Sequence, residues 1–147
     1  MLFSTATGYA LRTLAVLPED GKYSLAKQLA TMLDLPGPYL AKILQLLAQE
    51  GILQSVRGPR GGFRLARPAE AITVGEVVKA LEGTDAMAGC VMGYLHCDCD
   101  GTPCPLHASW IEVKAHMETS MTQVTIRDLQ GMGLHPLPKP ESEPAAG

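Results

Sequence analysis

The chain has 147 residues, of which 46% are hydrophobic and 18% are charged, so it is long enough to bury a core and too apolar to be disordered. No apolar run approaches the roughly 18 residues that a membrane-spanning helix needs, and the first residues lack the pattern of a secretory signal peptide. We therefore expect a cytoplasmic protein with no membrane partner, in which structural disulfides are disfavoured.

The net charge of −3 conceals an uneven distribution along the chain. Residues 1–82 carry nine Lys and Arg against seven Asp and Glu, whereas residues 83–147 carry three against eight. For a polyanionic partner, the local clustering of the basic residues in the first part matters more than the sum.

Three short helices are predicted in the first fifty residues. Leucines and alanines recur at helical spacing over residues 5–17, and the segment "PEDGKY" then interrupts the pattern. Ser24 is a favourable N-cap for a second helix. Pro38 suits the first turn of a third helix, which Gly51 ends.

The segment "ILQSVRGPRGGFRLARP" predicts a two-stranded β-hairpin, because alternating apolar residues flank a turn of Gly and Pro at residues 58–62. Three helices followed by a hairpin are the pattern of a winged helix-turn-helix. In that arrangement the third helix enters the DNA major groove and the hairpin, the wing, reaches an adjacent groove. The wing carries four arginines and no acid, which suits contact with phosphates or a narrow minor groove. These are Arg57, Arg60, Arg64 and Arg67.

Three polar side chains of the third helix are candidates for reading DNA. Gln45 has the donor and acceptor that a bidentate pair with adenine needs, and Lys42 suits guanine or phosphate. Tyr39 has two interpretations, a DNA contact or a partly buried packing residue.

The second half of the chain predicts two further helices. The segment "ITVGEVVKALEG" begins with Thr73 and Glu76 in the spacing of a capping box. A longer helix follows with an apolar seam close to a heptad repeat, which predicts a dimer interface, although the seam would also serve to cover the core of a monomer. The seam consists of Trp110, Val113, Met117, Met121 and Val124.

All four cysteines lie in the segment "CVMGYLHCDCDGTPCPLH", between these two helices. Thiolate and imidazole ligands suit zinc or an iron–sulfur cluster and exclude calcium and magnesium. The wide spacing of the cysteines differs from the tight pairs of structural zinc sites. It favours an iron–sulfur cluster, either [2Fe–2S] or [4Fe–4S], over zinc, with a thiol switch as a third interpretation.

Several of these segments together resemble the Rrf2 family of winged-helix regulators, which includes the iron–sulfur-cluster regulator and the nitric-oxide-sensitive repressor. The segments are "TGYALRTLAVL", "LPGPYLAKILQLLAQEGILQSVRGPRGGFRLARP", "ITVGEVVKALEG" and "CPLHASW", and the resemblance covers roughly residues 1–130. It implies a homodimeric bacterial transcription regulator, with its dimer built on the long helix and its sensing cysteines in the loop before that helix.

The resemblance also implies a ligand set. Cys90, Cys97 and Cys104 match the three cysteines of cluster-binding members, and His107 matches the histidine ligand of the iron–sulfur-cluster regulator. Cys99 is an additional thiol that would replace Cys97 after a local change of register.

Other matches concern DNA. Arg57 corresponds to the wing arginine of the family, with Pro59 beside it. Two positions depart from the pattern. Gly8 stands where some nitric-oxide sensors have an aspartate ligand, and Ala41 stands where the iron–sulfur-cluster regulator reads bases with a glutamate.

The sequence thus predicts a mainly α protein with a small β-hairpin, built as a winged helix-turn-helix plus a long dimerisation helix. We expect a DNA-binding domain over residues 1–83, a cluster-binding loop over 84–107, a dimerisation helix over 108–130 and a disordered tail over 131–147. The expected function is that of a dimeric repressor, not an enzyme, whose affinity for double-stranded DNA responds to redox, nitric oxide or iron–sulfur status through the cluster. The alternatives are a zinc or thiol-switch regulator without a cluster and, more remotely, a small iron–sulfur electron carrier.

Overall fold

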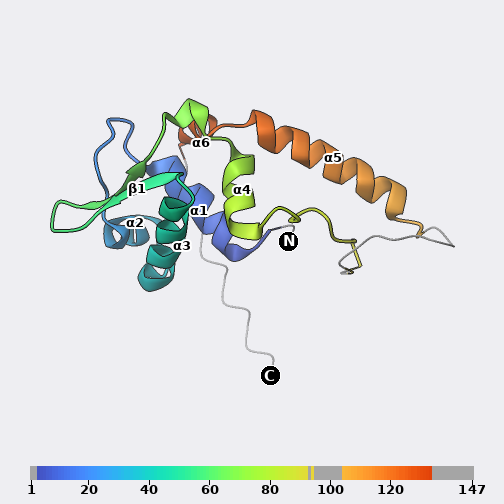
Figure 1. The fold of residues 1–147 in the computed structure, drawn as a ribbon, viewed down its shortest axis with the longest axis horizontal. Coiled ribbons are helices and arrows are strands. Elements are labelled where there is room, and N and C mark those ends of the chain that lie inside the picture. The colour runs from blue at the N-terminus through green and yellow to red at the C-terminus, as the bar shows by residue number, and fades with distance from the viewer. Residues whose placement is uncertain (1–2, 93, 95–103, 134–147) are drawn as a thin grey trace, which may run out of the picture.

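The computed structural model describes residues 3–92, 94 and 104–133 of the chain. Cys97, Cys99 and most of the predicted disordered tail lie outside the described residues. Figure 1 shows the order of the elements, which are α1 (Thr5–Val16), α2 (Ala26–Leu33), α3 (Gly37–Gln49), β1 (Leu53–Val56), β2 (Gly62–Leu65), η1 (Ala69–Ala71), α4 (Val74–Glu82), α5 (His107–Gln123) and α6 (Ile126–Gln130). Within the described part, no helix is long and apolar enough to span a membrane.

Helices α1 to α4 and the hairpin surround one leucine-rich core. Leu14 of α1 and both Leu40 and Leu44 of α3 are fully buried there. The third predicted helix is confirmed, with Pro38 in its first turn and its apolar stripe directed inward. The mainly helical fold with a small antiparallel hairpin therefore agrees with the winged helix-turn-helix that the sequence predicts.

The hairpin is attached to the helices through the connection between α1 and α2. Its strands pair in antiparallel register from Leu53↔Leu65 to Val56↔Gly62. The Ser24 N–H donates to the Phe63 carbonyl at 2.9 Å, and the Phe63 N–H donates to the Ser24 carbonyl at 2.8 Å. The prediction of Ser24 as an N-cap is therefore wrong. This residue is extended against β2, and α2 begins only at Ala26 with no side-chain cap.

Two glycines permit this close approach of backbones. A Cβ atom on Gly62 would lie 2.2 Å from the Ser24 carbonyl oxygen, and one on Gly61 would lie 2.1 Å from the Val56 carbonyl oxygen. Gly62 also has a φ of 124°, a region that side chains disfavour. Gly61 and Gly62 are thus required both for the turn of the wing and for the close approach of the backbone to Val56 and Ser24.

Helix α4 begins as predicted. The Thr73 hydroxyl accepts from the Glu76 N–H at 3.2 Å, and the Glu76 carboxylate accepts from the Thr73 N–H at 2.9 Å, which confirms the capping box. Arg67 donates to the same carboxylate and to the Ala71 carbonyl, so one wing arginine serves to hold the start of α4.

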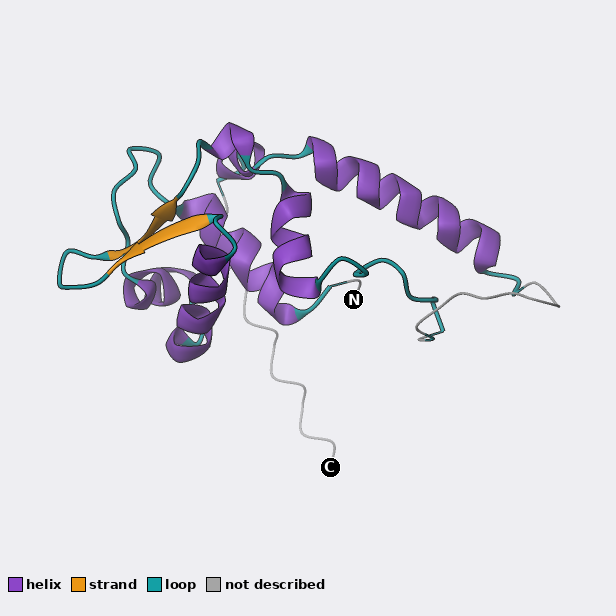
Figure 2. Cartoon of the chain, viewed as in Figure 1, coloured by secondary structure: helices purple, strands orange, loops and turns teal. Residues whose placement is uncertain are grey.

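The segment predicted as one helix over 108–130 consists of two helices. Helix α5 ends at Gln123, and a second capping box, Thr125 with Asp128, starts α6. Ile126 is fully buried in the main core, and Arg127 pairs with Glu19 at 3.1 Å and Glu70 at 3.0 Å. The chain therefore returns to the helical domain, while α5 extends away from it (Figure 2).

The last residue of α4, Glu82, caps the start of α1. Its Oε1 accepts from the Ser4 N–H at 2.7 Å, from the Ser4 hydroxyl at 2.6 Å and from the Thr7 hydroxyl at 2.6 Å. Burial raises the pKa of this carboxyl, but the hydrogen bonds from Ser4 and Thr7 outweigh burial and hold the pKa below its ordinary value of 4.5.

We expect Glu82→Ala to lower the free energy of unfolding by about 1–3 kcal/mol at neutral pH, because three donors lose a charged acceptor. A carboxyl with a lowered pKa stabilises the fold above its unfolded pKa, and this contribution is lost as the pH falls through the lower folded value. Urea unfolding at neutral pH and at about pH 3 should therefore show a difference between wild type and variant that shrinks in acid. A difference that persists unchanged in acid would contradict the role of the carboxylate.

Candidate DNA interface and cysteine loop

The three candidate residues of α3 all lie on its solvent side. Lys42 and Gln45 are exposed, and Tyr39 is 43% exposed. The Tyr39 ring also packs edge-on against Tyr9 of α1, with the centroids 5.9 Å apart. The packing interpretation of Tyr39 is therefore confirmed, while its exposed part keeps the DNA contact as a prediction.

The four arginines of the wing fall into two groups. Arg57 and Arg60 are exposed with Pro59 at the tip, and neither has a hydrogen bond or ion pair among the described residues. Arg64 instead donates from Nε to the Gln54 side chain at 3.0 Å, while Arg67 is bound to Glu76. Arg57 and Arg60 at the tip are thus available to a partner, whereas the two arginines nearer the base are held by side chains of their own chain.

The two described cysteines lie within the loop between α4 and α5. Cys90 and Cys104 are half-buried and neither forms a disulfide. The Met92 N–H donates to Cys90 Sγ at 3.3 Å. The His107 N–H donates to the Cys104 carbonyl at 3.0 Å as α5 begins. Among the described residues no three metal-ligating side chains meet, and the positions of Cys97 and Cys99 fall outside them.

Trp110 connects the two ends of this loop. Its indole Nε1–H donates to the Gly89 carbonyl at 2.9 Å, so the residue before Cys90 is bound to the first turn of α5. That turn begins with His107, three residues before Trp110 and therefore on the same side of the helix. The sequence assigned Trp110 to the dimer seam and missed this bond. The available signal was its indole N–H, which usually finds an acceptor when the ring is partly buried.

Most of the predicted dimer seam faces its own chain. Met121 is 8% exposed and packs in a small cluster with Val78 and Met87, against which Met117 is half-buried. Trp110 and Val124 are also half-buried, whereas Val113 is 46% exposed. The seam thus helps to cover the core of its own monomer, which is the alternative that the sequence left open.

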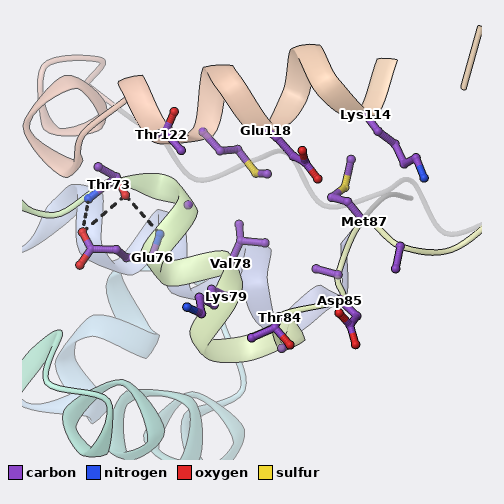
Figure 3. A pocket seen from close by; sticks show the side chains of 15 residues that line it. Thr73, Glu76, Val78, Lys79, Thr84, Asp85, Met87, Lys114, Glu118 and Thr122 are labelled. Atoms are coloured by element: carbon purple, nitrogen blue, oxygen red, sulfur yellow. Dashed lines mark hydrogen bonds between the residues drawn. The ribbon is translucent and has the colours of Figure 1, made fainter. Parts of the chain in front are cut away.

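A cavity of about 620 Å³ lies where α5 leaves the helical domain, between α4, residues 83–88 and α5. In Figure 3, α5 lies across the cavity from α4, and Val78 and Met87 are among its apolar lining. At one end of the cavity the helices are close, because a Cβ on Gly75 would lie 3.2 Å from the Met121 carbonyl oxygen. Helix α5 is therefore in close contact with α4 at Met121, near the C-terminal end of α5.

The helices, the wing and the exposed basic tip define a winged-helix DNA-binding regulator, and comparison with known proteins agrees. A model of the Rrf2 family, described as an iron-dependent transcriptional regulator, matches residues 3–131. The chain belongs to the Rrf2 family.

Two relatives and two solved structures illustrate the match. The chain is 30% identical over 131 residues to a regulator named NsrR from Shouchella clausii, which covers 88% of both chains. It is 40% identical over 89 residues to a regulator named IscR from Cereibacter sphaeroides, which covers 57% of each. The structure of T. potens IscR has a TM-score of 0.66 at 27% identity, covering 87% of this chain and 85% of that one. CymR, the global cysteine regulator of B. subtilis, shares the fold with a TM-score of 0.73 at 24% identity, covering 88% and 95%. As a DNA-binding transcriptional regulator, the chain is not an enzyme.

We expect Trp110→Phe, which keeps the ring and removes the donor, to release the Gly89 carbonyl. Amide exchange across residues 84–94 should become about three- to tenfold faster, in line with the loss of one hydrogen bond. Hydrogen exchange with mass spectrometry would measure this, with Ile111→Ala at the neighbouring exposed position as the control. Unchanged exchange in Trp110→Phe would mean that the bond does not hold the loop.

Proposed function

We propose that the chain is a cytoplasmic, dimeric transcriptional repressor whose affinity for double-stranded DNA depends on an iron–sulfur cluster in the loop between α4 and α5. The observation that carries the proposal is the bond from Trp110 to Gly89. It brings the residue before Cys90 to the helical turn that follows Cys104 and contains His107. The cluster would report redox, nitric oxide or iron–sulfur status.

DNA reading is assigned to α3 and the wing tip. Lys42, Gln45 and the free edge of Tyr39 lie on the exposed side of α3, where a recognition helix meets base edges. Arg57 and Arg60, with Pro59 between them, suit the phosphates or a narrow minor groove beside that site. The absence of any internal partner for these two arginines among the described residues supports this assignment.

The donor set of the loop fits a cluster. Cys90 and Cys104 are thiols outside any disulfide. The Met92 N–H donates to Cys90 Sγ, and hydrogen bonds of this type tune the reduction potential of an iron–sulfur cluster. Cys90, Cys97 and Cys104 would supply three thiolates and His107 the fourth ligand, with Cys99 as a substitute for Cys97. When bound, the cluster supplies a centre that reacts with oxidants and nitric oxide.

The chain's own contacts offer a path from the loop to the DNA-binding half. Gly89 is bound to Trp110 at the start of α5, and the other end of α5 is packed on α4 through Met121. A change in the loop would therefore move the N-terminal end of α5 about its fixed C-terminal end. In a dimer built on α5, such a rotation changes the distance between the two α3 helices, which must match half-sites about 34 Å apart.

The dimer is proposed from an apolar arc on α5 that is wider than the strip covered by its own chain. At about 100° per residue, Val113 lies next to the seam that contains Met117 and Met121, whereas Lys114 and Glu118 separate Ile111 from that seam. Val113 is 46% exposed. An arc of this width is expected to be covered by a second copy, most simply its own α5.

Val113→Lys should therefore convert the dimer into a monomer, because a charge would enter the apolar contact. Size-exclusion chromatography with light scattering measures the change, and Glu112→Lys, on the polar side of α5, should leave the dimer intact. A wild-type chain that is monomeric at micromolar concentration would contradict the proposal.

The cluster itself is tested by anaerobic purification of the full chain. We expect a brown protein that absorbs near about 400 nm and contains iron and sulfide. Cys104→Ala should lose the iron while remaining a folded dimer, whereas Cys99→Ala should retain it. DNA binding is then measured with the duplex that the wild-type chain enriches from a random-sequence pool, comparing protein with and without iron.

Two results would contradict the cluster. A colourless protein with stoichiometric zinc would favour a zinc site, and a metal-free protein with reversibly oxidised thiols would favour a thiol switch. Full iron retention in Cys104→Ala would remove that residue from the ligand set. A protein that binds no DNA in any state would instead suit the electron carrier.

A further inference from the structure

The side chain of Arg64 is held by two neutral groups in the free protein. Its Nε donates to Gln54 Oε1 at 3.0 Å, and Gln54 is its direct cross-strand partner in the hairpin register. Its guanidinium carbon lies 4.6 Å from the centroid of the Tyr23 ring, which is cation–π distance. Arg64 thus has no acidic partner in these contacts, yet it is fixed on both sides.

The Tyr23 contact reaches outside the hairpin. Tyr23 belongs to the connection between α1 and α2, and the next residue, Ser24, exchanges two backbone hydrogen bonds with Phe63. Phe63 is buried in the core and directly precedes Arg64. The backbone bonds therefore attach β2 to the helical domain at Phe63, and the Arg64–Tyr23 contact attaches it again one residue further along.

The buried Leu53 and Phe63 fix the base of the hairpin in the core, so any swing concerns the exposed residues beyond Val56. The contact to Tyr23 resists that swing, because it lies on the outward face of the hairpin while Phe63 is inserted on the inward face. The tip with Arg57 and Arg60 extends beyond this second attachment. The direction of the tip therefore depends on whether both attachments hold.

We propose that Arg64 is a positioning residue for DNA binding: it clamps the wing to Tyr23 so that Arg57 and Arg60 are directed at the DNA. The inference rests on the proposed DNA contact of the wing tip and replaces the assignment of Arg64 as a DNA ligand. The competing role is a direct phosphate contact by the remaining guanidinium N–H groups. The two roles differ in what Tyr23, an uncharged residue, contributes to affinity.

The test uses the full chain and the duplex that it enriches from a random-sequence pool. Tyr23→Leu and Arg64→Met should each weaken binding by about five- to tenfold, and the double variant should be no weaker than either single variant. Tyr23→Phe keeps the ring beneath the guanidinium and should bind within about twofold of wild type. In the free protein, amide exchange over residues 54–66 should become faster in Tyr23→Leu and Arg64→Met alike.

Other outcomes overturn the clamp. If Tyr23→Leu binds like wild type while Arg64→Met is weakened and its salt slope falls by about one phosphate, Arg64 is itself a DNA ligand. If exchange over residues 54–66 is unchanged in both variants, the contact does not position the wing. Arg57→Ala separates the two proposals, because its failure to weaken binding would overturn the DNA contact of the tip, while the exchange result on free protein still decides the clamp.

Discussion

The arrangement of the whole molecule depends on a short backbone pairing at residues 72–74 and 124–126. The Val74 N–H donates to the Val124 carbonyl at 2.9 Å, and the Ile126 N–H donates to the Ile72 carbonyl at 2.9 Å. Because Val124 directly follows α5, these bonds fix the end of the helix that extends away from the domain. The other described contacts of α5 are the packing of Met117 and Met121 near α4 and the bond from Trp110 to Gly89.

Two salt bridges and one buried side chain reinforce this pairing from the C-terminal side. Ile126 fills a position in the main core, and Arg127 is shared between Glu19 and Glu70. The ion pairs are partly exposed and each contributes little by itself. Their value is geometric, because they hold α6 against both η1 and the connection between α1 and α2, and so restrain the end of α5. A helix held in this way at one end and bound to the cysteine loop at the other is suited to convert a local change in that loop into a movement of the whole helix.

Local signals predicted the parts of the structure that depend on neighbours in sequence. The capping box at Thr73, Pro38 in the first turn of α3 and the glycine turn of the wing are all short-range features, and each is observed. The errors concern residues with long-range backbone partners. Ser24 has the chemistry of an N-cap, but its backbone pairs with Phe63, and no pattern near Ser24 reveals that partner.

In the candidate site, too, the features that depend on nearby residues were predictable and those that depend on distant residues were not. Exposure of Lys42, Gln45 and Arg57 followed from helical spacing and turn position, whereas the engagement of Arg64 depends on Tyr23, forty-one residues earlier. The heptad-like seam continues to Val124 and therefore predicts one long helix, whereas the Thr125–Asp128 capping box ends that helix and starts a new one. The ligand set of the loop came from resemblance, since spacing alone left a cluster, zinc and a thiol switch open.

The two capping boxes have a consequence for how this architecture can vary. Thr73 and Thr125 form a backbone bridge, so α4 and α6 start side by side, and the chain that leaves the domain after α4 returns to it beside the start of α4. Lengthening such an excursion in its cysteine loop adds closure entropy that grows only slowly with the number of residues. The loop can therefore gain or lose residues, cysteines among them, while the DNA-binding half keeps the same core and the same wing. The cysteine loop and the DNA-binding half are in this sense separately variable parts of one small protein.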